Sequence, residues 1–374
     1  MTSARNRLHS ICPYFAMFPE QFVRKHVVGH TDPGDVVFDP FSGRGTTVLE
    51  SLLLGRDAYG TDLNPVAVCV SNAKAAAPLL DAVLRRLRVL EAAADGAGRD
   101  CPETDDEFFT LCFHRATLAQ VLWLRAALRW RTDPVDCFIA AVALGCLHGE
   151  SHKTGNCFSN RMPRTISTKK AYSIAWWRGR GSEPPRRDVF AILRTMAAYR
   201  LATELPVRRG RVAECDARAA ASEFAGIAGK VRLVVTSPPY LDMTDYREDQ
   251  WLRLWFLGGD AQPTRGHADD RHRSAEPYWQ FLVEVWRGIR PLLAPNAMLV
   301  VRIGGTRVDF ETARARLLAS LREAIGPDVA PIDAGYASAI RGRQTNNFRP
   351  GTGGVREEFD FRYQIPAVHS STRQ

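Results

Sequence analysis

Gly34-Asp-Val-Val-Phe-Asp-Pro-Phe-Ser-Gly-Arg-Gly-Thr-Thr47 is the stretch that decides the fold. Its apolar start predicts a short strand, which Pro40 must end because proline donates no ladder hydrogen bond. A glycine-bearing loop follows, and then a helix with apolar side chains at helical spacing between 48 and 53. A second strand, 58–61, ends in Asp62, about twenty residues beyond the loop. The pattern predicts one β-α-β unit of a parallel sheet, with an acid after its second strand.

The loop and its flanking acids are compatible with a ligand that carries a ribose and a positive charge. In β-α-β units of this kind the acid after the second strand accepts hydrogen bonds from ribose hydroxyls, a role that falls on Asp62. Gly43 and Gly45 have no Cβ and let the backbone approach a ligand closely. The loop does not match the GxGxxG pattern of dinucleotide sites. Asp39 would repel a pyrophosphate, whereas it suits the ammonium group of a methionine moiety.

Another apolar strand, much later in the chain, runs into Ser237-Pro-Pro-Tyr240, where the prolines end the ladder of hydrogen bonds. The turn leaves a hydroxyl, a carbonyl and an aromatic ring at the carboxyl end of a strand, the edge at which open α/β sheets bind ligands. A flat ring with an exocyclic amine fits it. Tyr240 would stack on the ring, while Ser237 Oγ and the Pro238 carbonyl would accept hydrogen bonds from the NH2 group. For a Pro-Pro-Tyr sequence on its own, an ordinary strand-ending turn is the alternative interpretation.

Taken together, the two stretches resemble the sequence motifs of the DNA amino-methyltransferases, which methylate the exocyclic nitrogens of cytosine or adenine. The resemblance implies an α/β fold with the Rossmann-like sheet of the S-adenosylmethionine (SAM)-dependent methyltransferases, and SAM as the cofactor. It implies a catalytic motif made of Ser237, Pro238, Pro239 and Tyr240. It also implies that the cofactor contacts the loop and the ribose-binding acid, at Asp39, Pro40, Phe41, Gly43, Gly45, Thr46 and Asp62.

Two further segments extend the cofactor site by the same resemblance. Residues 12–20, which contain Tyr14 and Phe18, are similar to the aromatic segment ending in Phe-Pro that packs over the methionine end of SAM. A hydrophobic staple for the helix that starts near Glu20 is an equal alternative for any single residue. Asp216 follows a short strand and matches the acid that accepts from the adenine amino group, although a helix cap is its alternative role.

Residues 96–205 interrupt the alternation of strands and helices. Apolar residues at helical spacing in 117–130 and 134–147 predict helices, and hence a helical insertion. Its distal part, 148–190, carries nine lysines and arginines among aromatic residues against three acids, which suits contacts with phosphates and base edges. A solvated charged surface is the alternative. The expected domains are a cofactor half (1–95), an insertion that is a candidate target-recognition region (96–205) and a catalytic half (206–374).

Composition limits the kinds of binding partner and the cellular compartment that are expected. The net charge of +9 over 374 residues favours a polyanionic partner, and no apolar run is long enough to span a bilayer. The N-terminus shows no secretory signal and the eight cysteines form no CxxC pair, so we expect a reduced, cytoplasmic protein with no metal site and no membrane partner. The expected partner is double-stranded DNA with a flipped base, in a restriction–modification or defence setting with a cognate nuclease.

The expected chemistry is direct transfer of a methyl group to the amine, in which positioning and electrostatics are the main catalytic terms. No Pro-Cys dipeptide occurs, which excludes the covalent chemistry of C5-cytosine enzymes. Serine at the first motif position is typical of N4-cytosine enzymes, so N4-cytosine is predicted, with N6-adenine as the alternative. The cofactor loop precedes the catalytic motif, which departs from the commonest order among serine-type enzymes. An RNA or protein-amide substrate, and a nucleic-acid-binding protein without turnover, are the remaining alternatives.

Overall fold

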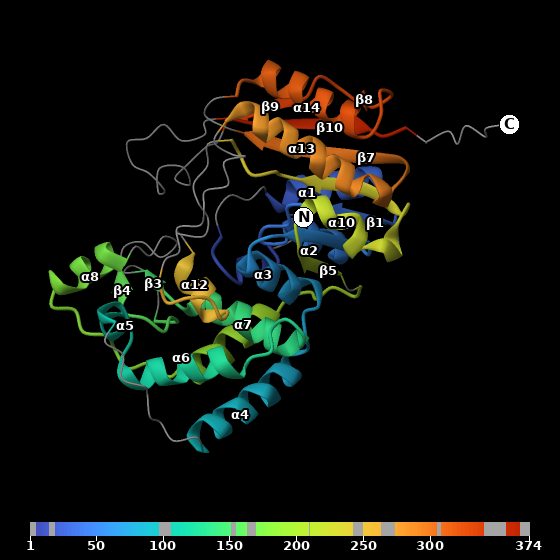
Figure 1. The fold of residues 1–374 in the computed structure, drawn as a ribbon. Coiled ribbons are helices and arrows are strands. Elements are labelled where there is room, and N and C mark those ends of the chain that lie inside the picture. Colours follow the sequence, from blue (N-terminus) through green and yellow to red (C-terminus); the bar gives the residue numbers. More distant parts are fainter. Residues whose placement is uncertain are drawn as a thin grey trace.

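The computed structural model describes residues 5–14, 19–96, 106–150, 155–162, 170–208, 210–241, 250–262, 274–304, 308–339 and 357–366. Helices flank a central sheet, and a second group of helices lies beside it, at the lower left of Figure 1. Across the described residues, every helix is too short or too polar to cross a lipid bilayer.

Eight strands of the described residues form the central sheet, in the order β5-β2-β1-β6-β7-β10-β8, with β9 also paired to β10. They are β1 (Val36–Asp39), β2 (Asp57–Asp62), β5 (Arg211–Glu214), β6 (Val231–Thr236), β7 (Leu293–Gly304), β8 (Ala330–Pro331), β9 (Tyr336–Ala339) and β10 (Glu357–Gln364). Neighbours from β5 to β7 are parallel, and β10 runs antiparallel to its partners. The chain moves outward from β1 in both directions, so a topological switch point lies between β1 and β6. This doubly wound sheet confirms the predicted α/β, Rossmann-like methyltransferase fold.

Helices cover both faces of the sheet because its buried strands alternate their side chains between them. On one face lie α1 (Glu20–His30), α2 (Thr46–Leu53) and α3 (Pro65–Ala75), and α1 packs on the side of β1 that carries Val37. On the other face lie α10 (Ala220–Glu223), α13 (Ala275–Ile289) and α14 (Phe310–Ala324), which enclose Phe38 and Val234. Single-turn 3-10 helices, η1 (Arg7–Ser10), η2 (Ala217–Ala219), η3 (Ala225–Ile227) and η5 (Arg290–Leu292), join these elements.

The predicted insertion is helical and packs on the cofactor half. The helix α4 (Leu80–Gly96) precedes it, and its elements are α5 (Glu107–Cys112), α6 (Arg115–Ala127), α7 (Pro134–Cys146), β3 (Gly149–Glu150), β4 (Arg161–Met162), α8 (Lys170–Arg178) and α9 (Val189–Leu201). Leu49 of α2 and Val68 of α3 share one hydrophobic cluster with Phe138 of α7. From the catalytic half, α12 (Trp251–Phe256) joins the same cluster, where Trp251 is 2% exposed and therefore part of the core. The domain boundaries given above stay a prediction.

The helix α6 ends earlier than the spacing of apolar residues predicts. Leu128 has extended backbone, and the N–H of Arg129 donates to Asp136 Oδ2 at 3.0 Å instead of to a helical carbonyl. The buried side chains of Leu128 and Trp130 therefore belong to a loop that packs on the core.

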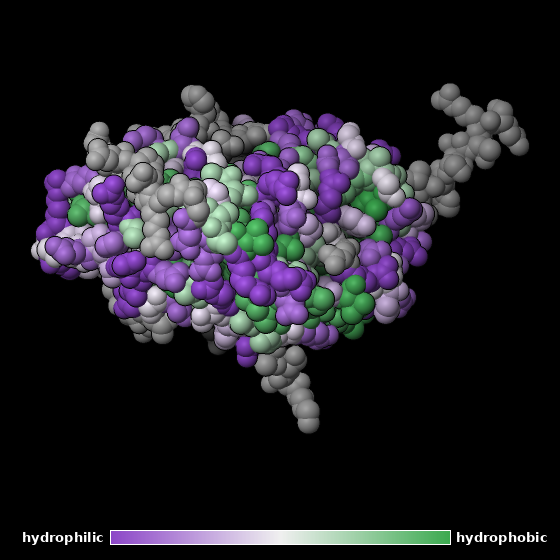
Figure 2. Space-filling view, turned by 90° about the horizontal axis from the view of Figure 1, so that it is seen from below, coloured by the Kyte–Doolittle hydropathy of each residue, from purple (hydrophilic) through white to green (hydrophobic). Residues whose placement is uncertain are grey.

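Hydrophilic residues are spread over the face drawn in Figure 2, and hydrophobic ones lie among them in separate areas.

Candidate cofactor and catalytic site

The cofactor loop and the Ser237–Tyr240 turn meet at one edge of the sheet. β1 and β6 are parallel neighbours, so their carboxyl ends lie side by side. Thr236, the last residue of β6, donates its hydroxyl to Asp39 Oδ1 at 2.7 Å, and Thr47 Oγ1 donates to the carbonyl of Val235 at 3.1 Å. Two motifs that are almost two hundred residues apart in the chain are thus joined directly.

The helix α3 holds the glycine loop in place. Ser71 Oγ donates to the carbonyl of Gly43 at 2.9 Å, and Lys74 Nζ donates to the carbonyl of Arg44. Gly45 has φ +72°, and a Cβ on it would lie 2.7 Å from Ser71 Oγ, so only glycine fits this close approach. Sequence reasoning missed Ser71 and Lys74. Their signal is a group of polar residues, Ser71, Asn72 and Lys74, in the second half of a helix that begins with apolar residues.

Asp62 lies at the end of β2 and faces the same loop. Its Oδ2 accepts from the N–H of Gly43 and its Oδ1 from the N–H of Asn64, both at 2.8 Å, and the residue is partly exposed. Tyr14 completes this corner, because its ring passes 3.8 Å from the Cβ position at Gly43 and its hydroxyl accepts from Asn64 Nδ2 at 3.3 Å. The structure therefore brings Tyr14, Gly43 and Asp62 together, as the resemblance implies. Phe18 lies outside the described residues.

The other predicted cofactor residues are buried or partly buried. Pro40 and Thr46 are buried, and Phe41 is partly buried with its N–H donating to Asp39 Oδ1 at 3.0 Å. Asp216, beyond the end of β5, caps η2 by accepting from the N–H of Arg218 at 2.9 Å, and its carboxylate also pairs with that guanidinium. The structure thus shows the capping role of Asp216, and its contact with adenine stays a prediction.

The catalytic turn is anchored to the last strand of the sheet. Ser237 and Pro239 are partly exposed, whereas Pro238 is buried and Tyr240 is 7% exposed. Tyr240 donates its hydroxyl to Glu358 Oε1 at 2.8 Å. Burial and the nearby Glu358 carboxylate raise the pKa of Tyr240, against a hydrogen bond with the Ser237 side chain that lowers it, so the phenol stays neutral. Sequence reasoning missed Glu358.

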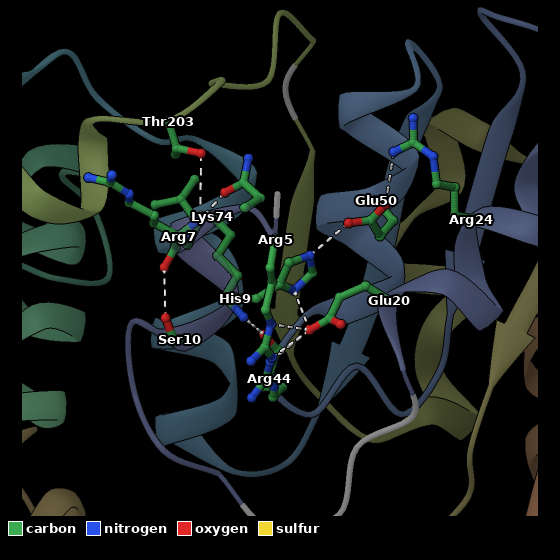
Figure 3. A network of polar contacts seen from close by, with 12 residues as sticks. Arg5, Arg7, His9, Ser10, Glu20, Arg24, Arg44, Glu50, Lys74 and Thr203 are labelled. Carbon is green, nitrogen blue, oxygen red and sulfur yellow. Dashed lines mark hydrogen bonds and ion pairs between the residues drawn. The ribbon is translucent and has the colours of Figure 1, made fainter. Parts of the chain in front are cut away.

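A buried polar network lies beside the loop and is drawn in Figure 3. His9 Nε2 lies 2.7 Å from Glu50 Oε1 of α2, and Arg44 Nη2 of the loop lies 3.6 Å from Glu20 Oε1 of α1. Burial lowers the pKa of His9 to about 2 and places the pKa of Lys74 well below its ordinary value. The network thus ties η1 and the start of α1 to the glycine loop.

The loop fits a polar ligand such as SAM. Among the described residues, the hydroxyl of Ser42 is buried and has no hydrogen-bond partner, although buried polar atoms in native proteins nearly always have one. Burial raises the pKa of both Asp39 and Asp62 to about 6, because a carboxylate is poorly solvated there. A ligand with a positive charge would stabilise the two carboxylates, and a ligand with hydroxyl groups would give the Ser42 hydroxyl a hydrogen-bond partner. SAM supplies both the charge and the hydroxyl groups.

Comparison with known families supports this assignment over the cofactor loop. Residues 2–72 match the family model N6_N4_Mtase, DNA methylase. The similarity of this segment to the N6/N4 DNA methylase family confirms the predicted resemblance, which implies SAM as the cofactor. The matched residues include Asp39 and Asp62 and do not reach Ser237.

Individual relatives match over short segments. The type II methyltransferase M.MjaII of Methanocaldococcus jannaschii is 33% identical over 67 residues, which are 18% of this chain and 13% of that protein. The orphan methyltransferase M.BamHII of Bacillus amyloliquefaciens is 30% identical over 88 residues, 24% of this chain and 30% of that protein. The chain thus matches less than a third of the length of either curated relative.

Solved structures show a more distant similarity. The rRNA methyltransferase aviRa from Streptomyces viridochromogenes aligns over 97% of this chain and 94% of its own, at 12% identity and a TM-score of 0.35. At that score the comparison adds nothing to the fold assignment, which follows from the strand order.

Asp39→Asn should change how stability depends on pH. The pKa of Asp39 in the folded protein, about 6, lies above its ordinary value of 3.8, so the folded protein holds this proton more tightly than the unfolded chain. The ligand-free wild type should therefore lose stability relative to the variant as the pH rises from about 4 to about 6, by about 1.4 kcal/mol per unit of difference in pKa. Urea denaturation across that range measures the effect.

Asp32→Asn, at an exposed acid of the turn before β1, is the matched control and should follow the wild type at every pH. Parallel pH curves for Asp39→Asn and the wild type would show that Asp39 does not hold its proton in the folded protein.

Proposed function

We propose that the protein is a SAM-dependent DNA methyltransferase that methylates the exocyclic N4 of cytosine within a specific DNA site. The direct hydrogen bond between Thr236 and Asp39 carries the proposal, because it places the Ser-Pro-Pro-Tyr turn beside the loop of the matched family segment. The serine in the first motif position favours cytosine. A restriction–modification or defence role, with a cognate nuclease, is part of the proposal, and type II methyltransferases among the relatives support it.

The roles of the cofactor residues follow from where they lie. Asp62 would accept hydrogen bonds from the ribose hydroxyls of SAM. Asp39, at the start of the loop, would offset the positive charge of SAM. Tyr14 would cover the cofactor at Gly43. A cofactor contact by Phe18 is part of the proposal by the resemblance alone. Asp216 would accept from the adenine amino group. Bound SAM supplies an electrophilic methyl group.

The catalytic turn would act on the amine of a flipped base. Ser237 Oγ and the carbonyl of Pro238 would accept hydrogen bonds from the NH2 group, which favours a tetrahedral nitrogen and localises its lone pair. The Tyr240 ring would stack on the base. Pro239 fixes the backbone so that these groups face one side. Because the turn works by positioning and electrostatics, no covalent intermediate with the protein is needed.

The distal insertion would hold the DNA. Its two neighbouring tryptophans differ in exposure. Trp177 is fully buried and therefore part of the core. Trp176 is partly exposed, and the Arg180 guanidinium lies 3.2 Å from its ring centroid. Tyr172, one turn earlier on α8, is 49% exposed. Exposed aromatic rings with arginines beside them suit contacts with bases and phosphates. The proposal therefore assigns target recognition to the region 96–205.

Methylation of whole plasmid DNA with labelled SAM, followed by digestion to nucleosides and mass spectrometry, tests the function. N4-methylcytosine is expected. N6-methyladenine would refute the base assignment and keep the enzyme class, and a SAM-binding protein that labels no DNA would refute the DNA substrate.

Ser237→Ala should leave SAM affinity unchanged and lower the turnover number by about a hundredfold, since one preorganised hydrogen bond to the reacting group is lost. Single-turnover methylation of plasmid DNA measures the rate, and calorimetry with SAM is the internal control. A rate close to that of the wild type would remove Ser237 from the mechanism.

Asp62→Ala should weaken SAM binding by about ten- to a hundredfold, as the loss of a hydrogen bond to a charged group predicts. Asp57→Ala is the matched control, because Asp57 lies at the opposite end of β2 and pairs with Arg208. Calorimetry with SAM compares the two variants. Equal affinities would contradict the ribose assignment.

Arg180→Ala together with Arg186→Ala should weaken DNA binding and reduce its salt dependence. Both side chains are exposed, and the loss of two phosphate contacts should make the slope of log K against log salt shallower by about 1.8. Lys230→Ala with Arg232→Ala removes the same charge from exposed positions at the amino end of β6, away from the proposed site. If both pairs change the slope equally, the insertion is not the DNA-binding surface.

A further inference from the structure

A chain of polar contacts runs from the catalytic turn into the sheet. Tyr240 donates its hydroxyl to Glu358 Oε1 at 2.8 Å, and Glu358 Oε2 lies 3.3 Å from Nη1 of Arg302 on β7. Arg302 is itself held by Asp360, with Nε and Nη2 donating to the two carboxylate oxygens at 2.6 and 2.7 Å. Each oxygen of Glu358 thus has its own partner, one on the turn and one on the sheet.

The sequence of β10 explains why this chain exists. Its residues alternate, so that Phe359 and Phe361 enter the hydrophobic cluster on one face while Glu358 and Asp360 lie on the other. That second face is the one covered by α1, where the Arg302 guanidinium lies 4.0 Å from the ring centroid of Phe22. Because Arg302 is 7% exposed and bound on three sides, it cannot move away from Glu358 without leaving buried charges unpaired.

The position of the Tyr240 ring depends on this anchor. β6 ends at Thr236, and the two prolines that follow provide no N–H groups for the ladder. Among the described residues, the Tyr240 hydroxyl has two side-chain partners, Glu358 and Ser237. A hydroxyl oxygen that is fixed at the far end of the side chain fixes the direction in which the ring points. Because a phenolic O–H prefers to lie in the plane of its ring, its hydrogen bond to Glu358 also favours one ring plane, and a ring that stacks on a base must have one.

We propose that Glu358 is a positioning residue that sets the ring of Tyr240 for stacking on the target base, with Arg302 and Asp360 holding Glu358 in place. The proposal rests on the proposed function, because it assigns to Tyr240 the contact with the flipped base. Glu358 touches neither cofactor nor base in this account and acts only through the Tyr240 hydroxyl.

Glu358→Leu removes the acceptor and keeps a side chain of similar length, and it should lower the turnover number by about ten- to a hundredfold with SAM affinity unchanged. Glu358→Gln, which can still accept a hydrogen bond, should restore part of that loss. Tyr240→Phe should also lower the turnover number, and the double variant should lose less than the product of the two single losses, since the contact between Tyr240 and Glu358 is missing from both single variants. Glu357→Gln, at the exposed neighbouring position, is the control and should match the wild type.

A measurement that needs no activity accompanies these rates. In protein labelled at tyrosine Cζ with 13C, the Tyr240 resonance is assigned by its absence in Tyr240→Phe and should shift in Glu358→Leu and not in Glu357→Gln. If the resonance shifts while the wild type methylates no DNA, the contact stands and the proposed function fails. If the wild type is active and Glu358→Leu is as fast, or if the double variant multiplies the two losses, Glu358 does not position Tyr240.

Discussion

The buried carboxylate of Asp39 joins the two halves of the site, and the arrangement of the other groups depends on it. Asp39 is 1% exposed at the end of β1, where it accepts from the hydroxyl of Thr236 and the N–H of Phe41. A buried carboxylate without such partners would strongly destabilise the fold. The start of the cofactor loop and the end of β6 are therefore fixed relative to each other, which a parallel pair of strands alone would not ensure.

The helix α3 extends this constraint to the insertion. On one side it holds two loop carbonyls through Ser71 and Lys74, and on the other it shares a hydrophobic cluster with α7. The backbone of the loop is thus connected to α7 through a packed helix and two hydrogen bonds. This gives a physical reason why an inserted helical region and a cofactor loop form one unit, although they are separate in the sequence.

Local patterns in the sequence were enough to predict the helices and strands and much of the site. The β-α-β unit, the strand before Ser237 and the helical insertion follow from periodicity and from prolines that end strands, and each is present. The contacts that fix the site were beyond such patterns, because they join residues far apart in the chain. Glu358 meets Tyr240 across 118 positions, and nothing near either residue identifies its partner. Asp216 is the opposite case. The local rule for helix caps gave capping as its alternative role, and the structure shows that Asp216 caps η2.

The charges around the loop suggest why so many ionisable groups are buried there. Asp39 and Asp62 have pKa values raised to about 6 by burial, and Lys74 of α3 and Arg44 of the loop have pKa values lowered by burial. Each group is thus held in an environment that disfavours its charged form. A cationic cofactor placed beside Asp39 and Asp62 would favour the charged form of both carboxylates. Relief of the unfavourable electrostatics around the loop would then become part of the driving force for binding SAM, which is the general logic of a preorganised site.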